Sequence, residues 1–152
     1  MARIQVQEAL FDMGAESAAL TASRTDVGGV ASFLGVCRGD DGLAAMVLEH
    51  YPGMTERALG RIAAEAEARW PLTGCTVIHR VGRILPGEPI VLVLTASAHR
   101  AAALEACAFL IDWLKTKAPF WKHEEFADGD ARWVAAKNED DAAAARWSAK
   151  QG

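Results

Sequence analysis

The segment that most constrains the fold is the near-continuous apolar run at residues 90–96, which reads IVLVLTA. A run of this kind is typical of a strand that is buried on both faces, and therefore of the interior of a sheet. A second strand is predicted at 75–81, and a turn at Pro86–Gly87 links the two. These two strands form the predicted centre of the fold.

One long helix is predicted before these strands in the sequence, and another after them. One follows the Pro52–Gly53 break, where Leu59, Ile62, Ala63, Ala66 and Trp70 recur at helical spacing. The other begins after Ser97, a favourable N-cap residue, and extends to about Lys117, because Pro119 cannot continue a helix. The residues predicted to form its buried stripe are Leu104, Cys107, Ala108, Ile111 and Leu114.

The remaining elements are short. Strands are predicted at 4–7, 30–36 and 45–50, the last two as a hairpin around the turn at 39–42, with a brief helix at 15–22. The tail predicts a hairpin of strands at 123–126 and 132–135, followed by a terminal helix from 139 to about 150. This order of elements predicts an α+β fold and argues against a doubly wound parallel sheet.

Composition bounds the class of protein. The 152 residues suit one compact domain spanning 1–152, and the net charge of −4 argues against a general nucleic-acid coat, which needs a broad basic surface. The chain contains no apolar run long enough to cross a membrane and no signal-peptide pattern at its start, so we expect a cytoplasmic protein with no membrane partner. Three widely spaced cysteines predict neither a disulfide framework nor a structural metal site.

Positive charge is concentrated at one place in this acidic chain. Residues 114–122 read LKTKAPFWK and put three lysines around a helix end at Ala118–Pro119, which suits an anionic ligand. The alternative is that Lys115 and Lys117 only complement the helix dipole and that Lys122 is a solvated surface charge.

A second candidate anion site lies at the other end of the same helix. His99 and Arg100 fall in its first turn, where free backbone N–H groups favour negative charge. A capping histidine and a surface ion pair are the alternatives. Arg100 and Lys115 are separated by about 22 Å along a straight helix, so a site that contains both needs a returning loop or a second subunit.

Cys37 is a further candidate because Arg38 follows it. A neighbouring guanidinium can stabilise a thiolate, which would make Cys37 a sulfur carrier or nucleophile. We favour the alternative that it is a small apolar residue at a strand end, since no histidine base is near it in the sequence.

Four segments taken together resemble the large, catalytic subunit of molybdopterin synthase. They are LEHYPGMTE at 48–56, VIHRVG at 77–82, SAHR at 97–100 and LKTKAPFWK at 114–122, and the similarity is collinear from about Val30 to Trp147. This family implies an α/β hammerhead-like domain with an additional antiparallel β subdomain. It also implies a homodimer that binds two small ubiquitin-like sulfur-carrier subunits, forming a heterotetramer.

The resemblance implies an activity and a set of site residues. The C-terminal thiocarboxylate of the small subunit would supply the sulfur that converts cyclic pyranopterin monophosphate into the dithiolene of molybdopterin, with no metal or cofactor of the enzyme's own. Lys115 would transfer protons and Lys122 would stabilise charge. The residues implied to bind substrate are Val36, Cys37, Arg38, His99, Arg100, Lys115, Lys122, His123, Glu124 and Lys137.

Two positions depart from the family pattern. The family usually has Gly-x-Val-Arg where residues 35–38 of this chain read GVCR, so Cys37 replaces a valine. Lys137 stands where the family usually has an arginine that is donated across the dimer to the substrate phosphate. Lysine keeps the charge of that arginine but loses its bidentate geometry. Two other functions remain open at this point: a non-catalytic module that binds the tail of a ubiquitin-like protein, and a sulfurtransferase that depends on Cys37.

Overall fold

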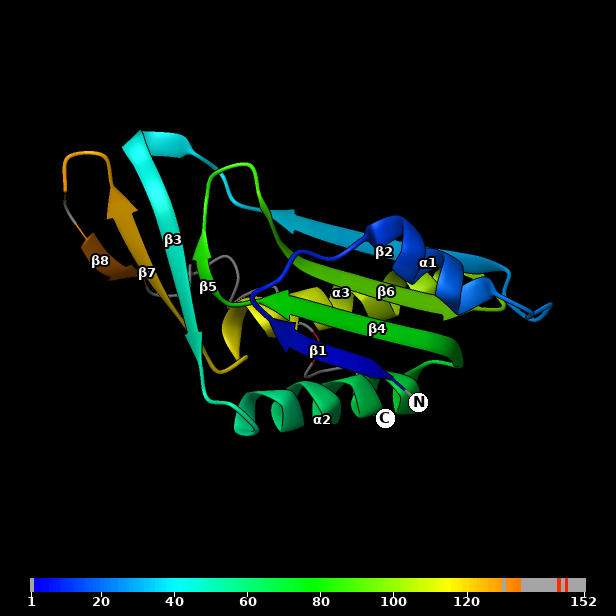
Figure 1. Ribbon diagram of the computed structural model, residues 1–152. Helices are drawn as coiled ribbons and strands as arrows, with labels where there is room; N and C mark the ends of the chain where they lie inside the picture. The colour runs from blue at the N-terminus through cyan, green and yellow to red at the C-terminus, as the bar shows by residue number, and fades with distance from the viewer. Residues whose placement is uncertain (1, 130, 135–144, 146, 148–152) are drawn as a thin grey trace.

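The computed structural model describes residues 2–129, 131–134, 145 and 147 (Figure 1). In this part of the chain a mixed sheet has the strand order β1-β4-β6-β2 and an antiparallel sheet has the order β5-β3-β7-β8. The first sheet consists of β1 (Arg3–Gln7), β4 (Leu72–Arg80), β6 (Pro89–Ser97) and β2 (Gly29–Val36). The second consists of β5 (Gly82–Ile84), β3 (Leu43–His50), β7 (Phe120–Phe126) and β8 (Ala131–Val134). The predicted α+β class is confirmed.

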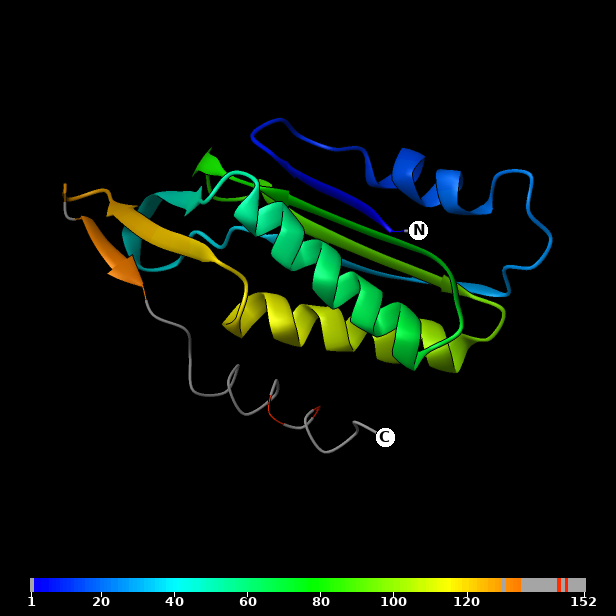
Figure 2. The same ribbon diagram turned by 90° about the horizontal axis from the view of Figure 1, so that it is seen from below.

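Helices cover both faces of the first sheet. The long helices α2 (Met54–Arg69) and α3 (Arg100–Thr116) lie side by side on one face, and the short α1 (Met13–Thr21) lies on the other (Figures 1 and 2). None of the described helices is long and apolar enough to cross a membrane.

The run at 90–96 forms an interior strand, as its composition predicts. Val91 and Val93 belong to the core beneath α2 and α3, whereas Leu92 and Leu94 belong to a separate core beneath α1. Because successive side chains of a strand point to opposite faces, a strand covered on both sides has to be apolar throughout. Strand β6 pairs with β4 on one edge and with β2 on the other.

The predicted hairpin of 30–36 and 45–50 is wrong. β2 pairs with β6 of the first sheet, whereas β3 pairs with β5 and β7 of the second. The chain between them passes through a short 3-10 helix, η1 (Asp40–Gly42). Before this helix, the Cys37 N–H donates a hydrogen bond of 2.9 Å to the carbonyl of Glu88, in the turn that precedes β6. Turn residues indicate that the chain changes direction, but they do not select the partner strand.

The buried stripe of α3 also differs from the prediction. Leu104 is 60% exposed, and the buried residues of the helix are Ala102, Ala103, Ala106, Cys107, Phe109 and Leu110. Small alanine side chains allow the helix to pack closely on the sheet, which a pattern built on the largest apolar residues misses. Of the predicted stripe, Cys107 is buried, and Ala108, Ile111 and Leu114 are partly buried and pack against the same core.

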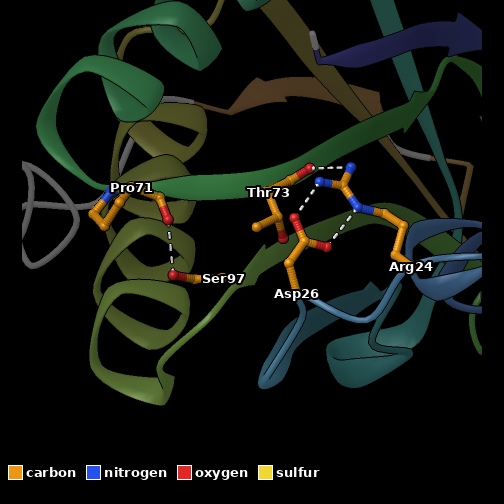
Figure 3. Close-up of polar contacts among 5 residues, drawn as sticks. All are labelled: Arg24, Asp26, Pro71, Thr73 and Ser97. Carbon is orange, nitrogen blue, oxygen red and sulfur yellow. Dashed lines mark hydrogen bonds and ion pairs between the residues drawn. The ribbon is translucent and has the colours of Figure 1, made fainter.

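The predicted N-cap is displaced as well. His99 occupies the N-cap position of α3, and the Ser97 hydroxyl donates to the Pro71 carbonyl at 2.8 Å (Figure 3). The tail hairpin is confirmed by the pairing of β7 with β8. Most of the predicted terminal helix at 139–150 lies outside the described residues, although Trp147 is buried against Trp70 and Phe109.

Candidate functional site

The two catalytic candidates flank the turn from α3 into β7. Lys115 is in the last turn of α3, Lys117 is its C-cap, and β7 begins at Phe120. The Thr55 hydroxyl, which is fully buried, donates to the Pro119 carbonyl at 3.3 Å and accepts the Tyr51 N–H at 3.0 Å. The turn between the two lysines is therefore tied to the start of α2.

Successive side chains of β7 point to opposite faces of the strand, so the candidate site residues on β7 fall into two sets. Lys122 pairs with Leu48 and Glu124 pairs with Met46, and these β3 residues belong to a small buried cluster with Cys37 and Ile84. His123 pairs with Val47, so its side chain lies on the opposite face of the strand. The structure thus brings Lys122 and Glu124 together over one core but does not bring His123 to it.

Cys37 lies next to this pair. It is 4% exposed, and burial raises the pKa of its thiol, with the carboxylates of Glu124 and Glu88 acting in the same direction and the ammonium of Lys122 opposing them. A nucleophilic thiolate requires a lowered pKa, so this environment favours the protonated thiol. The preceding residue, Val36, is 47% exposed.

Arg38 does not stabilise a thiolate in this arrangement. Its side chain is 78% exposed, and its Nε lies 2.9 Å from a carboxylate oxygen of Asp40. The guanidinium therefore sits at the surface where β2 ends, as an open ion pair that an incoming anion can compete for.

A histidine that is not among the predicted site residues lies in contact with the turn. His79, in β4, is 7% exposed, and its ring stacks on that of Phe120 with centroids 4.0 Å apart. Burial lowers its pKa from 6.5 to about 4, while its bond to the Arg80 carbonyl acts against this shift and the charges of Lys115 and His50 add to it. Lys115, His50 and His79 therefore form one neighbourhood. The HR pair within the VIHRVG segment was the available signal, but strand-end packing explains that pair equally well.

His99 and Arg100 lie at the opposite end of α3 from Lys115. This end is supported by close backbone packing, since a Cβ on Gly28 would be 1.9 Å from the Ala98 carbonyl oxygen. Nearby, Arg24 donates to the Thr73 carbonyl at 3.0 Å and pairs with Asp26 at 2.7 Å (Figure 3). One chain therefore holds its two cationic sites apart, as the helix length predicts. Lys137 lies outside the described residues.

A pocket of about 510 Å³ opens beside His50, between the ends of β1 and β3. Its lining includes the carboxylates of Glu8 and Glu49, so it differs in charge from the lysine region. In the described part of the chain, no three histidine, cysteine or acidic side chains gather as potential metal ligands.

Comparison with known proteins gives consistent matches. The family model described as MoaE protein matches residues 6–117, which extends the similarity to β1 and α1. The molybdopterin synthase catalytic subunit of Mesorhizobium japonicum is 60% identical over 146 residues, covering 95% of this chain and 92% of that protein.

Solved structures agree with these sequence matches. The MoaE protein from Burkholderia ambifaria superposes with a TM-score of 0.83 at 53% identity, covering 97% of this chain and 99% of that one. A chain from the complex of subunits 1 and 2 of the Helicobacter pylori molybdopterin-converting factor shares the fold with a TM-score of 0.69 at 19% identity, covering 89% of this chain and 90% of that one. With a family model that matches most of its length and a relative of this identity, the chain belongs to the MoaE family of molybdopterin synthase catalytic subunits.

Proposed function

We propose that this chain transfers sulfur from the C-terminal thiocarboxylate of a small ubiquitin-like subunit to cyclic pyranopterin monophosphate, forming the dithiolene of molybdopterin. The observation that carries the proposal is the placement of Lys115 and Lys122 on either side of one braced turn, next to the buried His79. Two ammonium groups at one place suit a reaction in which a cyclic phosphate opens and negative charge develops.

Lys115 is the proposed proton-transfer group. A lysine serves as acid or base near neutrality only if its pKa falls well below about 10.4, which needs loss of water or neighbouring positive charge. Its side chain is exposed in the single chain, and the Arg100 of the same chain is a helix length away. A bound partner or a second copy of the chain would add desolvation and positive charge, both of which lower a lysine pKa.

Lys122 is proposed to place the substrate and to stabilise charge. It lies on the face of β7 that meets Cys37, with Glu124 two residues further on. Arg38 completes this region as an exposed guanidinium that can pair with phosphate or carboxylate. Val36 and Cys37 would form the apolar wall of the pocket.

A homodimer is part of the proposal. Arg100 and His99 cannot reach the Lys115 of their own chain, but the same helix start of a second copy can complete the pocket. Lys137 is proposed to contribute from the tail in the same way. The Helicobacter pylori protein of the same fold is part of a two-subunit complex, which supports a small subunit as the further partner and hence a heterotetramer.

A non-catalytic module that captures the tail of a ubiquitin-like protein would use the same lysines. Turnover separates the two functions, because such a module binds the partner and leaves the cyclic pterin unchanged. A Cys37-dependent transferase is disfavoured by the raised pKa of that thiol.

The test combines the protein with a thiocarboxylated small subunit and cyclic pyranopterin monophosphate, and measures molybdopterin. Lys115→Ala should lose nearly all activity and Lys122→Ala should be severely impaired, both with native circular dichroism. Lys117→Ala removes the same charge from the exposed C-cap of α3 and is the matched control. Activity of Lys115→Ala comparable to that of the control would contradict the assigned role.

A further inference from the structure

A stacked pair of rings joins the two sheets at the point where the chain enters β7. His79 is the residue before the last of β4, in the first sheet, and Phe120 is the first residue of β7, in the second. Their ring planes are inclined by 21° with centroids 4.0 Å apart. The orientation of the first residues of β7 therefore depends on a side chain from a different sheet.

The imidazole is itself held in one orientation. Its Nδ1 lies 2.9 Å from the Arg80 carbonyl oxygen, which can only accept, so Nδ1 carries the proton and Nε2 carries the lone pair. Burial keeps the ring neutral, since its pKa is lowered to about 4. Phe120 thus rests on a flat, uncharged and fixed surface.

Both candidate lysines lie close to this contact. Lys122 is two residues beyond Phe120 and so lies on the same face of β7, and the charge of Lys115 acts on the His79 ring. The buried Thr55 holds the Pro119 carbonyl from the side of α2. The relative placement of the two lysines is consequently determined by how this short turn is held.

We propose that His79 is a positioning residue for sulfur transfer: stacked on Phe120, its ring holds the start of β7 so that Lys115 and Lys122 act on one substrate. The inference rests on the proposed function of the two lysines. His79 needs no contact with substrate for this role. Because a misplacement of about 1 Å can cost about a hundredfold in rate, loss of the ring should lower kcat by about ten- to a hundredfold and leave KM nearly unchanged.

Three substitutions separate the ring from the hydrogen bond. His79→Phe keeps a flat ring and loses the bond to the Arg80 carbonyl, His79→Asn keeps a donor near Nδ1 and loses the ring, and His79→Leu loses both. Val77→Ala is the matched control, because Val77 lies two residues earlier on the same face of β4 and is 1% exposed. We expect kcat to decrease in the order native, Phe, Asn, with Leu no better than Asn, and the control to stay near native.

A second measurement makes the result independent of turnover. Hydrogen exchange of the peptide 117–126, measured in the protein alone, should be faster in His79→Leu than in Val77→Ala. If the native protein makes no molybdopterin, the proposed function fails, and the exchange data still report whether the ring holds this segment. A native-like kcat in His79→Leu, a higher kcat in Asn than in Phe, or unchanged exchange would overturn the positioning role.

Discussion

Acid should destabilise the folded protein through His79, by an amount that follows from the pKa of its ring. Burial lowers this pKa from 6.5 to about 4. As the pH falls, the unfolded chain takes up a proton on the ring near pH 6.5, whereas the folded protein does so only near pH 4. In this window the unfolded state binds more protons, so the free energy of unfolding falls with falling pH.

The size of the effect can be calculated from the two pKa values. Linkage gives a loss of about 2 kcal/mol between pH 8 and pH 5 from this one ring. Domains of this kind have a total stability of about 5 to 15 kcal/mol, so the loss is large enough to measure. The carboxylates titrate mainly below this window, which separates their contribution from that of His79.

Urea unfolding at pH 8, 6.5 and 5, followed by tryptophan fluorescence, measures this loss. All samples need the same protein concentration, because self-association makes apparent stability depend on it. His79→Asn is the control, since its amide can donate to the Arg80 carbonyl and does not titrate. The native protein should lose about 2 kcal/mol more than the variant between pH 8 and pH 5. Equal losses in the two proteins would refute the assignment of a buried, neutral His79.

Four further predictions concern assembly, packing and the thiol. Mixing Lys115→Ala and Arg100→Ala chains, each inactive alone if both residues are required, should restore about a quarter of native activity if Arg100 acts across the dimer, because about half of the dimers are mixed and one of the two pockets in each is intact; no recovery would refute donation of Arg100 across the dimer. Gly28→Ala should lower the free energy of unfolding by about 3 kcal/mol, because its Cβ would meet a backbone carbonyl oxygen at 1.9 Å. Gly60→Ala, in α2, where the added Cβ would meet nothing within 4 Å beyond its chain neighbours and the adjacent helix backbone, should instead stabilise by about 0.5 to 1 kcal/mol in the same urea assay. Cys37→Ser should keep most turnover, since the sulfur is proposed to arrive on the partner; complete loss with intact partner binding would reverse that view.

Several features of the fold could be read from the sequence because they depend on local patterns. The run at 90–96 identified an interior strand, and the helical spacing from Leu59 to Ala66 identified α2. The proline at 119 placed the end of α3 within a few residues. The four segments LEHYPGMTE, VIHRVG, SAHR and LKTKAPFWK indicated the family, which the comparisons confirm.

The remaining features of the fold depend on contacts between segments that are far apart in the sequence. Nothing in the residues around 39–42 distinguishes a hairpin from a crossing between two sheets, since the same turn chemistry serves both. The pairing partner of β2 depends on β6, an interior strand whose second edge is hydrogen-bonded to β2. The phase of α3 likewise depends on close packing of alanines against the sheet and not on the largest side chains.

The site divides in the same way. The sequence by itself determined which cations are concentrated near Pro119, and helix length determined that Arg100 and Lys115 of one chain stay apart. Only the tertiary structure placed His79 against Phe120 and Cys37 near Lys122, because these contacts join residues that are 41 and 85 positions apart. Burial then decided the protonation states, since the pKa of a side chain depends on the water and charges around it and not on its neighbours in sequence.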